Sequence, residues 1–523
     1  MKQQTFLIIG LVLIGFLLRL PSLQLGLWQD EASTYFDALP NDFETIINTV
    51  IYSELNPPGF YLIMHQWMQW FGSQEIIFKL PALFFGLLLI PSTYALGRLT
   101  GSREAGLIAA TVATFTQDAV YYSQEARPYT LAALLCCWVI FLYCKAIATT
   151  KYQTWYLVTF VICADILLYV QYTGLLLIGS LIIITLLLLC NRAVNIKIMP
   201  FAIAFGTIFL LFMPWLPIFL THLYTGTPWT SKDSFLRALS GNISYTILEP
   251  RKAVFLCILL GLGVKLKDFL AQIKETNYKH GIFPEIHTFI LGTCFILLAV
   301  MQAILSYGGR YMLPFTPIAW AFYGSCFFAL FQCLSDFINS RWTGQWYRFS
   351  RQVILVVIIV LLVFANKYDF YFGNINKSGI RALANDWELT KPQDKTMYIL
   401  SPDFLGPTFG YYFAKHPVPF YGFARWDKPE IFSPIDYAEI WSNPTLIEDT
   451  EQRIQQEIQK GYTQLALIQV SEPMGDAGKV KYSQINQFLA RLKQKYSLLK
   501  KTDYPGQLQS VSLYLFDLIN IAK

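Results

Sequence analysis

The feature that most constrains this chain is a series of long apolar runs, which recurs through its first two-thirds. A run of about twenty apolar residues is long enough to cross the hydrocarbon core of a bilayer as a helix. We therefore predict a mainly α, polytopic membrane bundle with about eleven spans, of which the eighth is the shortest. The predicted spans are 6–23, 77–97, 104–121, 129–148, 155–172, 174–190, 198–219, 252–265, 287–305, 311–334 and 352–366.

The composition supports this class of protein. Hydrophobic residues make up 54% of the chain and charged residues only 14%, with a mean hydropathy of +0.42. About a quarter of the residues in an ordinary soluble protein are charged. The net charge of +6 does not indicate a nucleic-acid partner, because the basic residues of membrane proteins gather in short cytoplasmic loops. No small-residue cleavage site follows the first run, so we expect a retained span rather than a removed signal peptide.

Lysine and arginine positions predict the orientation of the spans. Lys2 precedes the first run, and Arg98 and Arg103 lie between the second and third runs. The loops after the fourth, sixth, eighth and tenth runs are also basic, so the positive-inside rule places the amino terminus in the cytoplasm. An odd number of spans then places the end of the chain outside. We expect a multi-pass protein of the cytoplasmic (inner) membrane with its site on the extracytoplasmic face.

The predicted topology divides the chain into a transmembrane part and a part outside the membrane. Residues 1–366 form the predicted transmembrane domain, with a first extracytoplasmic loop at 24–76. Residues 367–523 alternate short apolar runs with helical patterns, which predicts an extracytoplasmic α/β domain. Its predicted strands are 397–401, 465–470 and 511–518. Its predicted helices are 448–461, which Gly461 ends, and 482–501.

The first extracytoplasmic loop is acidic and carries two amphipathic patterns. Apolar residues recur at helical spacing over 43–51, and the segment 59–72 is rich in aromatic residues. Both patterns are typical of helices that lie in the membrane interface. Asp30 and Glu31 open the loop, and a carboxylate there is suited to act as general base on an acceptor hydroxyl. The alternative is a solvated connector with no chemistry.

Charged residues in other loops fall on the same predicted face. Arg127 and Glu125 follow the third span, and Arg310 and Tyr311 precede the tenth. A guanidinium at the bilayer edge can hold a phosphate through paired hydrogen bonds, although an arginine there can also simply reach the lipid headgroups. Asp118, near the end of the third span, is either a functional carboxylate or a buried helix–helix hydrogen bond.

Four motifs together resemble the GT-C class of membrane glycosyltransferases, and within it glycosyltransferase family 39. This family includes the protein O-mannosyltransferases and the lipid A aminoarabinose transferases. The resemblance implies an inverting transferase that takes its sugar (a hexose or a pentose) from a polyprenyl-phosphate donor. The motifs are "LWQDEA" at 27–32, "ELNPPGFYLIMHQW" at 54–67, "YSQEARPYTL" at 122–131 and "GGRYMLPFTP" at 308–317.

The resemblance also implies roles for individual residues. Asp30 matches the family's catalytic aspartate, with Glu31 beside it, and Glu125 matches a carboxylate of the pocket. Arg127 and Arg310 match the positive groups near the donor phosphate, and Tyr311 completes the predicted phosphate-binding site. Glu54, Asp118 and Tyr129 complete the predicted acceptor site or pocket.

One departure from the family leaves the acceptor open. The aminoarabinose transferases have Glu-Lys directly before the two prolines, where this chain has Leu55-Asn56. The acceptor is therefore a glycolipid, a polysaccharide or a protein, and membrane lipids surround the site. The sequence shows no metal cluster and indicates no cofactor, and dependence on a divalent metal stays open. The alternative function is a membrane transporter or lipid flippase, which favours repeated halves and charges near the bilayer midplane.

Overall fold

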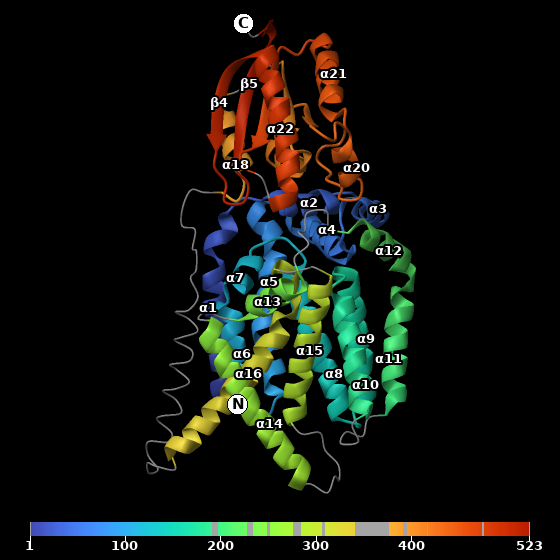
Figure 1. Cartoon of the computed structure of the whole chain (residues 1–523), viewed down its shortest axis with the longest axis vertical. Helices are drawn as coiled ribbons and strands as arrows, with labels where there is room; N and C mark the ends of the chain where they lie inside the picture. The colour runs from blue at the N-terminus through green and yellow to red at the C-terminus, as the bar shows by residue number, and fades with distance from the viewer. Residues whose placement is uncertain are drawn as a thin grey trace. The chain divides into compact units, whose positions relative to one another are not determined.

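The chain forms two compact units in its computed structural model (Figure 1). The structure describes residues 2–190, 197–226, 234–247, 251–275, 284–305, 309–339, 376–390, 395–415, 417–472 and 475–521. Unit 1 contains Met1–Pro21, Lys79–Pro217 and Lys232–Phe370. Unit 2 contains Ser22–Phe78, Ile218–Ser231 and Tyr371–Lys523. The first loop therefore belongs to the same unit as the carboxy-terminal residues.

Unit 1 is helical, and two of its helices extend into unit 2. Its helices are α1 (Lys2–Arg19), α5 (Glu75–Arg98), α6 (Arg103–Phe115), α7 (Gln117–Tyr122), α8 (Tyr129–Ala148), α9 (Gln153–Val170), α10 (Gly174–Cys190), α11 (Ile198–Phe212), α12 (Leu216–Thr225), α13 (Phe235–Thr246), α14 (Arg251–Glu275), α15 (Pro284–Ile304) and α16 (Thr316–Asn339). Single 3-10 turns precede α12 and α16, namely η2 (Met213–Trp215) and η3 (Gly309–Phe315).

The predicted membrane architecture is confirmed, although the number of spans stays a prediction. Within the described ranges, seven helices are long and apolar enough to cross a bilayer, and Gly174–Cys190 is a shorter apolar helix. The predicted third span is interrupted at Thr116, where the backbone becomes extended between α6 and α7. The predicted short eighth span is part of the longer α14, and the predicted span 352–366 lies outside the described residues.

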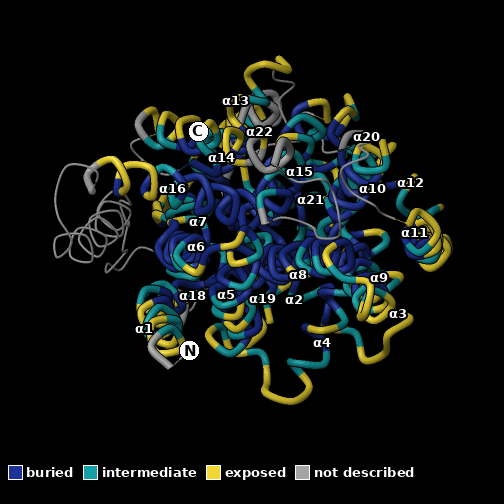
Figure 2. The backbone as a smooth tube through the Cα atoms, turned by 90° about the horizontal axis from the view of Figure 1, so that it is seen from below, coloured by how far each residue is buried: buried dark blue, intermediate teal, exposed yellow. Residues whose placement is uncertain are grey.

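Small residues allow the helices of unit 1 to pack closely. A Cβ on Gly324 of α16 would lie 2.5 Å from the Ala105 carbonyl oxygen of α6, and one on Gly261 of α14 would lie 2.0 Å from the Cys326 carbonyl oxygen. Such close approach of backbones is a main source of helix association in membranes. Figure 2 shows α6 and α8 as largely buried and α1 and α11 as largely exposed, so the apolar faces of α1 and α11 are available to lipid.

The first loop of unit 2 folds into three helices around a small apolar core. These helices are α2 (Gln29–Ala38), which follows the turn η1 (Pro21–Gln24), then α3 (Phe43–Ser53) and α4 (Gly59–Phe71). The two helices predicted in this loop are therefore confirmed. Asp42 begins α3 by accepting a 2.8 Å hydrogen bond from the Thr45 backbone N–H, which is the usual N-cap interaction. Ile46, Val50 and Tyr61 form the core between the helices.

The carboxy-terminal part of unit 2 contains a five-stranded sheet of order β2-β1-β3-β5-β4. Strand β1 is parallel to β2 and β3, whereas β5 is antiparallel to β3 and β4. The strands are β1 (Thr396–Ser401), β2 (Phe420–Gly422), β3 (Gln464–Val470), β4 (Tyr496–Tyr504) and β5 (Val511–Ile521). The helices are α18 (Gly379–Thr390), α19 (Gly406–Phe413), α20 (Tyr437–Ser442), α21 (Leu446–Gln459) and α22 (Gly475–Lys495), with the turn η4 (Asp403–Leu405).

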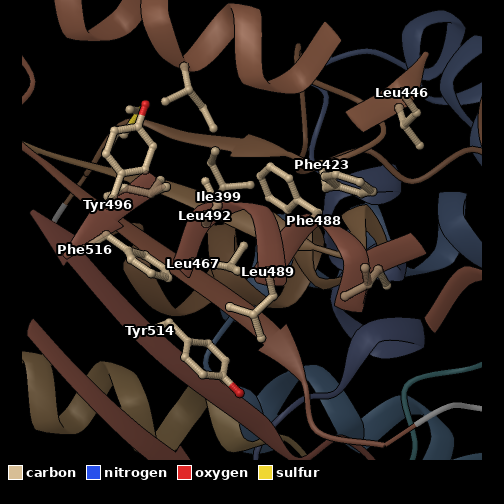
Figure 3. Close-up of a cluster of buried hydrophobic side chains, with 14 of the residues drawn as sticks. Ile399, Phe423, Leu446, Leu467, Phe488, Leu489, Leu492, Tyr496, Tyr514 and Phe516 are labelled. Carbon is tan, nitrogen blue, oxygen red and sulfur yellow. The ribbon is translucent and has the colours of Figure 1, made fainter. Parts of the chain in front are cut away.

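Helices cover both faces of this sheet. On one face, Ile380 of α18 and Phe409 of α19 pack against alternate strand residues. On the other, side chains of α20, α21 and α22 pack with Leu467 and Phe516, and Figure 3 shows the two strand residues in one cluster with Phe488 and Leu489 of α22. A sheet that buries both faces in this way needs two apolar layers, which explains why strands β1 and β3 are apolar almost throughout.

Two elements of the sheet were not predicted. The helix predicted over 482–501 is wrong in its last six residues, because α22 ends at Lys495 and β4 begins at Tyr496. Leucines and lysines in β4 fit helical spacing, yet β4 is an edge strand whose middle is exposed, and lysines are common on such edges. Strand β2 has only three residues, too few for a periodic pattern.

The buried ring of Phe516 provides a test of this core. Phe516 is fully buried in β5, whereas Leu499 on the edge strand is 51% exposed. We expect Phe516→Ala to destabilise unit 2 by about 3–5 kcal/mol because it leaves a cavity, and Leu499→Ala to have little effect. Thermal unfolding of the full-length protein in detergent measures both, and equal melting temperatures for the two variants would contradict the predicted core.

Candidate active site

The residues singled out in the sequence fall into two sets, one in each compact unit. Unit 2 holds Asp30, Glu31 and Glu54. Unit 1 holds Asp118, Glu125, Arg127, Tyr129, Arg310 and Tyr311.

Helix α2 gives its two acidic residues different surroundings. Asp30 and Glu31 both lie in the first turn of α2, where the helix dipole favours negative charge. Successive side chains of a helix point in different directions, and here Asp30 is half-exposed whereas Glu31 is completely buried. Of the two carboxylates, that of Asp30 is therefore the more accessible to solvent.

Glu31 forms a buried ion pair with Lys377. The Lys377 Nζ lies 2.8 Å from the Glu31 Oε2, and the two side chains are 2% and 0% exposed. Removing one partner of such a pair leaves a buried charge, which costs far more than an exposed ion pair contributes. Glu31 therefore attaches α2, and with it Asp30, to the residues that lead into α18. The sequence analysis missed Lys377, because no local pattern connects residues so far apart.

Further contacts within unit 2 attach the first loop to the carboxy-terminal residues. The Leu27 backbone N–H donates a 2.7 Å hydrogen bond to the Tyr412 hydroxyl. Burial, together with the Glu75 carboxylate, raises the pKa of Tyr412, so this hydroxyl stays protonated. Arg381 forms an ion pair with Glu75 at 3.0 Å and donates to the Gln24 carbonyl oxygen at 2.8 Å. The segment 24–27, just before Asp30, is thus bound at one end by Arg381 and at the other by Tyr412.

Glu54 lies at the point where the chain departs from the family pattern. It ends α3 and is 8% exposed. The Asn56 side-chain amide donates to its carboxylate at the long distance of 3.5 Å, and His222 interacts with it electrostatically. The His222 ring is in turn 3.0 Å from the Ile51 carbonyl oxygen. The acidic group of the motif is therefore present, and an uncharged amide stands in the position before the prolines.

In unit 1, the structure brings Arg310 together with aromatic residues. Its guanidinium carbon lies 5.9 Å from the centre of the Tyr129 ring and 5.7 Å from that of Tyr311. Tyr129 also meets Tyr122 edge to face, with 5.2 Å between ring centres. An arginine can stack on an aromatic ring, and its planar guanidinium matches the geometry of a phosphate. This grouping is suited to a phosphate beside a ring-shaped sugar.

Glu125 and Arg127 lie in a tight buried turn that leads into α8. The Arg127 backbone N–H donates to the Glu125 carbonyl oxygen at 2.7 Å. Pro128 then begins α8, and Thr130 donates to the Ala82 carbonyl oxygen of α5 at 3.1 Å. Arg127 is 5% exposed and Glu125 is 1% exposed. Arg127 is thus a buried cation in a chain that crosses the membrane.

The structure adds residues around Asp118 that the sequence analysis did not single out. Tyr245 of α13 interacts electrostatically with Asp118 and Tyr122. Arg251, the first residue of α14, also interacts with Asp118. Tyr122 belongs to one of the four motifs, and the other two lie at 220–251, between the predicted spans 198–219 and 252–265, which is extracytoplasmic in the predicted topology. The predicted location of Tyr245 and Arg251 on that face is the sequence signal that could have identified them. Within the described ranges, no group of three or more His, Cys, Asp or Glu side chains is placed to hold a metal ion.

Comparisons with known proteins agree with this architecture. Residues 56–218 match the family described as dolichyl-phosphate-mannose-protein mannosyltransferase. The structure of ArnT from Cupriavidus metallidurans in the apo state is similar, with a TM-score of 0.60 and 12% identity over 98% of this chain and 97% of that one. The same protein bound to undecaprenyl phosphate gives a TM-score of 0.56 and 11% identity, with the same coverage. No match is found among the curated proteins.

A second similar structure comes from an archaeon. AglB, the oligosaccharyltransferase of Archaeoglobus fulgidus, in complex with an inhibitory peptide and a dolichol-phosphate, gives a TM-score of 0.53 and 13% identity. The similarity covers 95% of this chain and 72% of that one. The chain therefore has the GT-C fold of membrane glycosyltransferases, with a small carboxy-terminal sheet domain. With the family match, this confirms the resemblance to glycosyltransferase family 39 that the four motifs predict.

The buried ion pair of unit 2 predicts a specific pattern of stability. We expect Lys377→Met to destabilise the protein by about 3–5 kcal/mol, because the Glu31 carboxylate stays buried without its cation. The double variant Glu31→Leu with Lys377→Met should recover most of this loss. Lys500→Met, on the exposed edge strand, is the matched control. Melting temperatures of the full-length protein provide the measurement, and a Lys377→Met protein as stable as the wild type would rule out the pair.

Proposed function

We propose that this protein transfers a sugar from a polyprenyl-phosphate donor to a hydroxyl-bearing acceptor at the extracytoplasmic face of the cytoplasmic membrane. The observation that carries the proposal is the Arg310 guanidinium placed over Tyr129 and Tyr311. It occurs in a fold for which one solved example, ArnT, is bound to undecaprenyl phosphate. The acceptor would be a glycolipid, a polysaccharide or a protein.

Arg310 and Arg127 would hold the donor phosphate. A guanidinium donates two parallel hydrogen bonds to phosphate oxygens, and such charge-assisted bonds are about twice as strong as neutral ones. The same cations stabilise the phosphate as it departs from the sugar with the bonding electron pair. Tyr129 and Tyr122 offer ring faces and hydroxyls of the kind that bind a sugar. Glu125, Asp118 and Glu54 would contribute acceptors for sugar or acceptor hydroxyls.

Asp30 would act as the general base. It takes the proton of the acceptor hydroxyl as that oxygen forms a bond to the anomeric carbon, and the bond from this carbon to the phosphate oxygen breaks. One displacement inverts the anomeric centre. Glu31, paired with Lys377, would not transfer the proton itself but would fix the position of α2. This refines the predicted role of Glu31 from a catalytic residue to a positioning residue.

The role of Asp30 can be tested in cells that lack the protein. We expect the envelope glycan that is missing in such cells to return with the wild type and with Asp42→Asn. Asp42 caps α3, and asparagine caps a helix equally well. Asp30→Asn should reduce transfer by about 10²–10⁴-fold, the usual contribution of a general base. Normal glycan from the Asp30→Asn variant would exclude Asp30 as the base.

The phosphate-binding role of Arg310 predicts a loss that lysine does not repair. We expect Arg310→Gln to weaken binding of undecaprenyl phosphate about 10-fold to 100-fold, as expected for one charge-assisted interaction. Arg310→Lys should recover little, because an ammonium lacks the planar pair of donors. Native mass spectrometry of the purified protein measures binding, with Arg103→Gln in the first turn of α6 as control. Full binding by Arg310→Gln would remove Arg310 from the phosphate site.

A further inference from the structure

Arg19 ends the first helix of unit 1 and is completely buried. Its side chain is 0% exposed, although it lies within Gln4–Gln24, an apolar segment long enough to cross the membrane. A buried guanidinium is costly unless its donors are all satisfied. The sequence analysis treated Arg19 only as part of an apolar segment, and the proposed reaction does not use it.

The Arg19 guanidinium joins α1 to the end of α6. It donates to the carbonyl oxygens of Ala113 and Thr114, each at 3.2 Å, and to that of Gly15 at 3.0 Å. Helix α6 ends at Phe115, so the Ala113 and Thr114 carbonyls belong to its last turn, where the helix itself supplies no donors. A cation is also favoured at this end of the helix dipole. Arg19 therefore fixes the point at which the predicted third span breaks.

Arg19 also holds the segment that precedes Glu125 and Arg127. Its Nε donates to the Ser123 hydroxyl at 3.0 Å, and the Gln124 side-chain amide donates back to the Arg19 carbonyl oxygen at 2.9 Å. Gly86 of α5 leaves room for this arrangement, since a Cβ there would lie 2.1 Å from the Ser123 hydroxyl oxygen. Two consecutive residues are thus tied to one residue of α1, immediately before the tight turn.

We infer that Arg19 is a positioning residue for the turn at residues 123–128, which carries Arg127 to the donor phosphate. The inference rests on the proposed function for the role of Arg127. All of the contacts lie within unit 1, and they leave the turn little freedom, because it is held by Arg19 before Glu125 and by Pro128 and α8 after Arg127. Arg19 itself touches no substrate, and its effect passes through Ser123 and Gln124.

The test uses the full-length protein in nanodiscs, with undecaprenyl phosphate as the probe. We expect Arg19→Gln to weaken binding about tenfold. The double variant with Arg127→Gln should bind no more weakly than Arg127→Gln alone, because both changes act on one interaction. Ser123→Ala, which removes a single hydrogen bond, should show a smaller loss of the same kind. Arg98→Gln is the control, since Arg98 is exposed at the far end of α5.

Hydrogen exchange of peptides covering 117–128 gives a second readout that needs no ligand. Exchange should rise in Arg19→Gln and stay unchanged in Arg98→Gln. Unchanged exchange and unchanged binding in Arg19→Gln, or independent losses in the double variant, would overturn the inference. If the wild-type protein does not bind undecaprenyl phosphate, the proposed function fails. A rise in exchange would then leave Arg19 with a purely structural role, which also overturns the inference.

Discussion

The ion pair between Glu31 and Lys377 is the interaction on which unit 2 depends. Both charges are withdrawn from water, so neither residue tolerates the loss of its partner. The pair connects the first turn of α2, where Asp30 lies, to the residues before α18. A carboxylate that has to meet a substrate hydroxyl needs a fixed position, because an error of about 1 Å can reduce a rate about a hundredfold. A buried charge pair fixes the position of α2, because each charge is stable in the interior only while it lies next to the other.

In unit 1 as well, a buried charged side chain fixes the position of a helix end. A helix that ends inside a membrane protein exposes carbonyl oxygens that need donors. Arg19 supplies them for α6, and the segment that follows is thereby held next to α1. In both units, a buried charged residue holds the segment that carries a residue with a proposed role in the reaction. Asp30 is adjacent to Glu31, and Arg127 lies three residues after Gln124.

Much of this architecture could be predicted from local patterns. The membrane class, the loop helices α3 and α4, three of the strands and the family resemblance all follow from periodicity and motifs. Asp30 and Arg310 were singled out because short motifs surround them. Lys377, Arg19 and Arg251 were not, because each takes its meaning from residues distant in the chain. Strand β4 was missed for another reason, since its leucines and lysines fit helical spacing and only pairing with β5 makes it a strand.

The pairing of Glu31 with Lys377 also sets an order of events during synthesis. The two residues are 346 positions apart, and in the predicted topology every span after the first lies between them. A chain emerges from its amino terminus first, and distant contacts form late. Until the last part of the chain has crossed the membrane, the first loop is therefore exposed at the outer surface and the Glu31 carboxylate is in water. Only after that can the ion pair form and fix the helix that carries Asp30, so a chain released early would carry every motif in that loop without the contact that orders it.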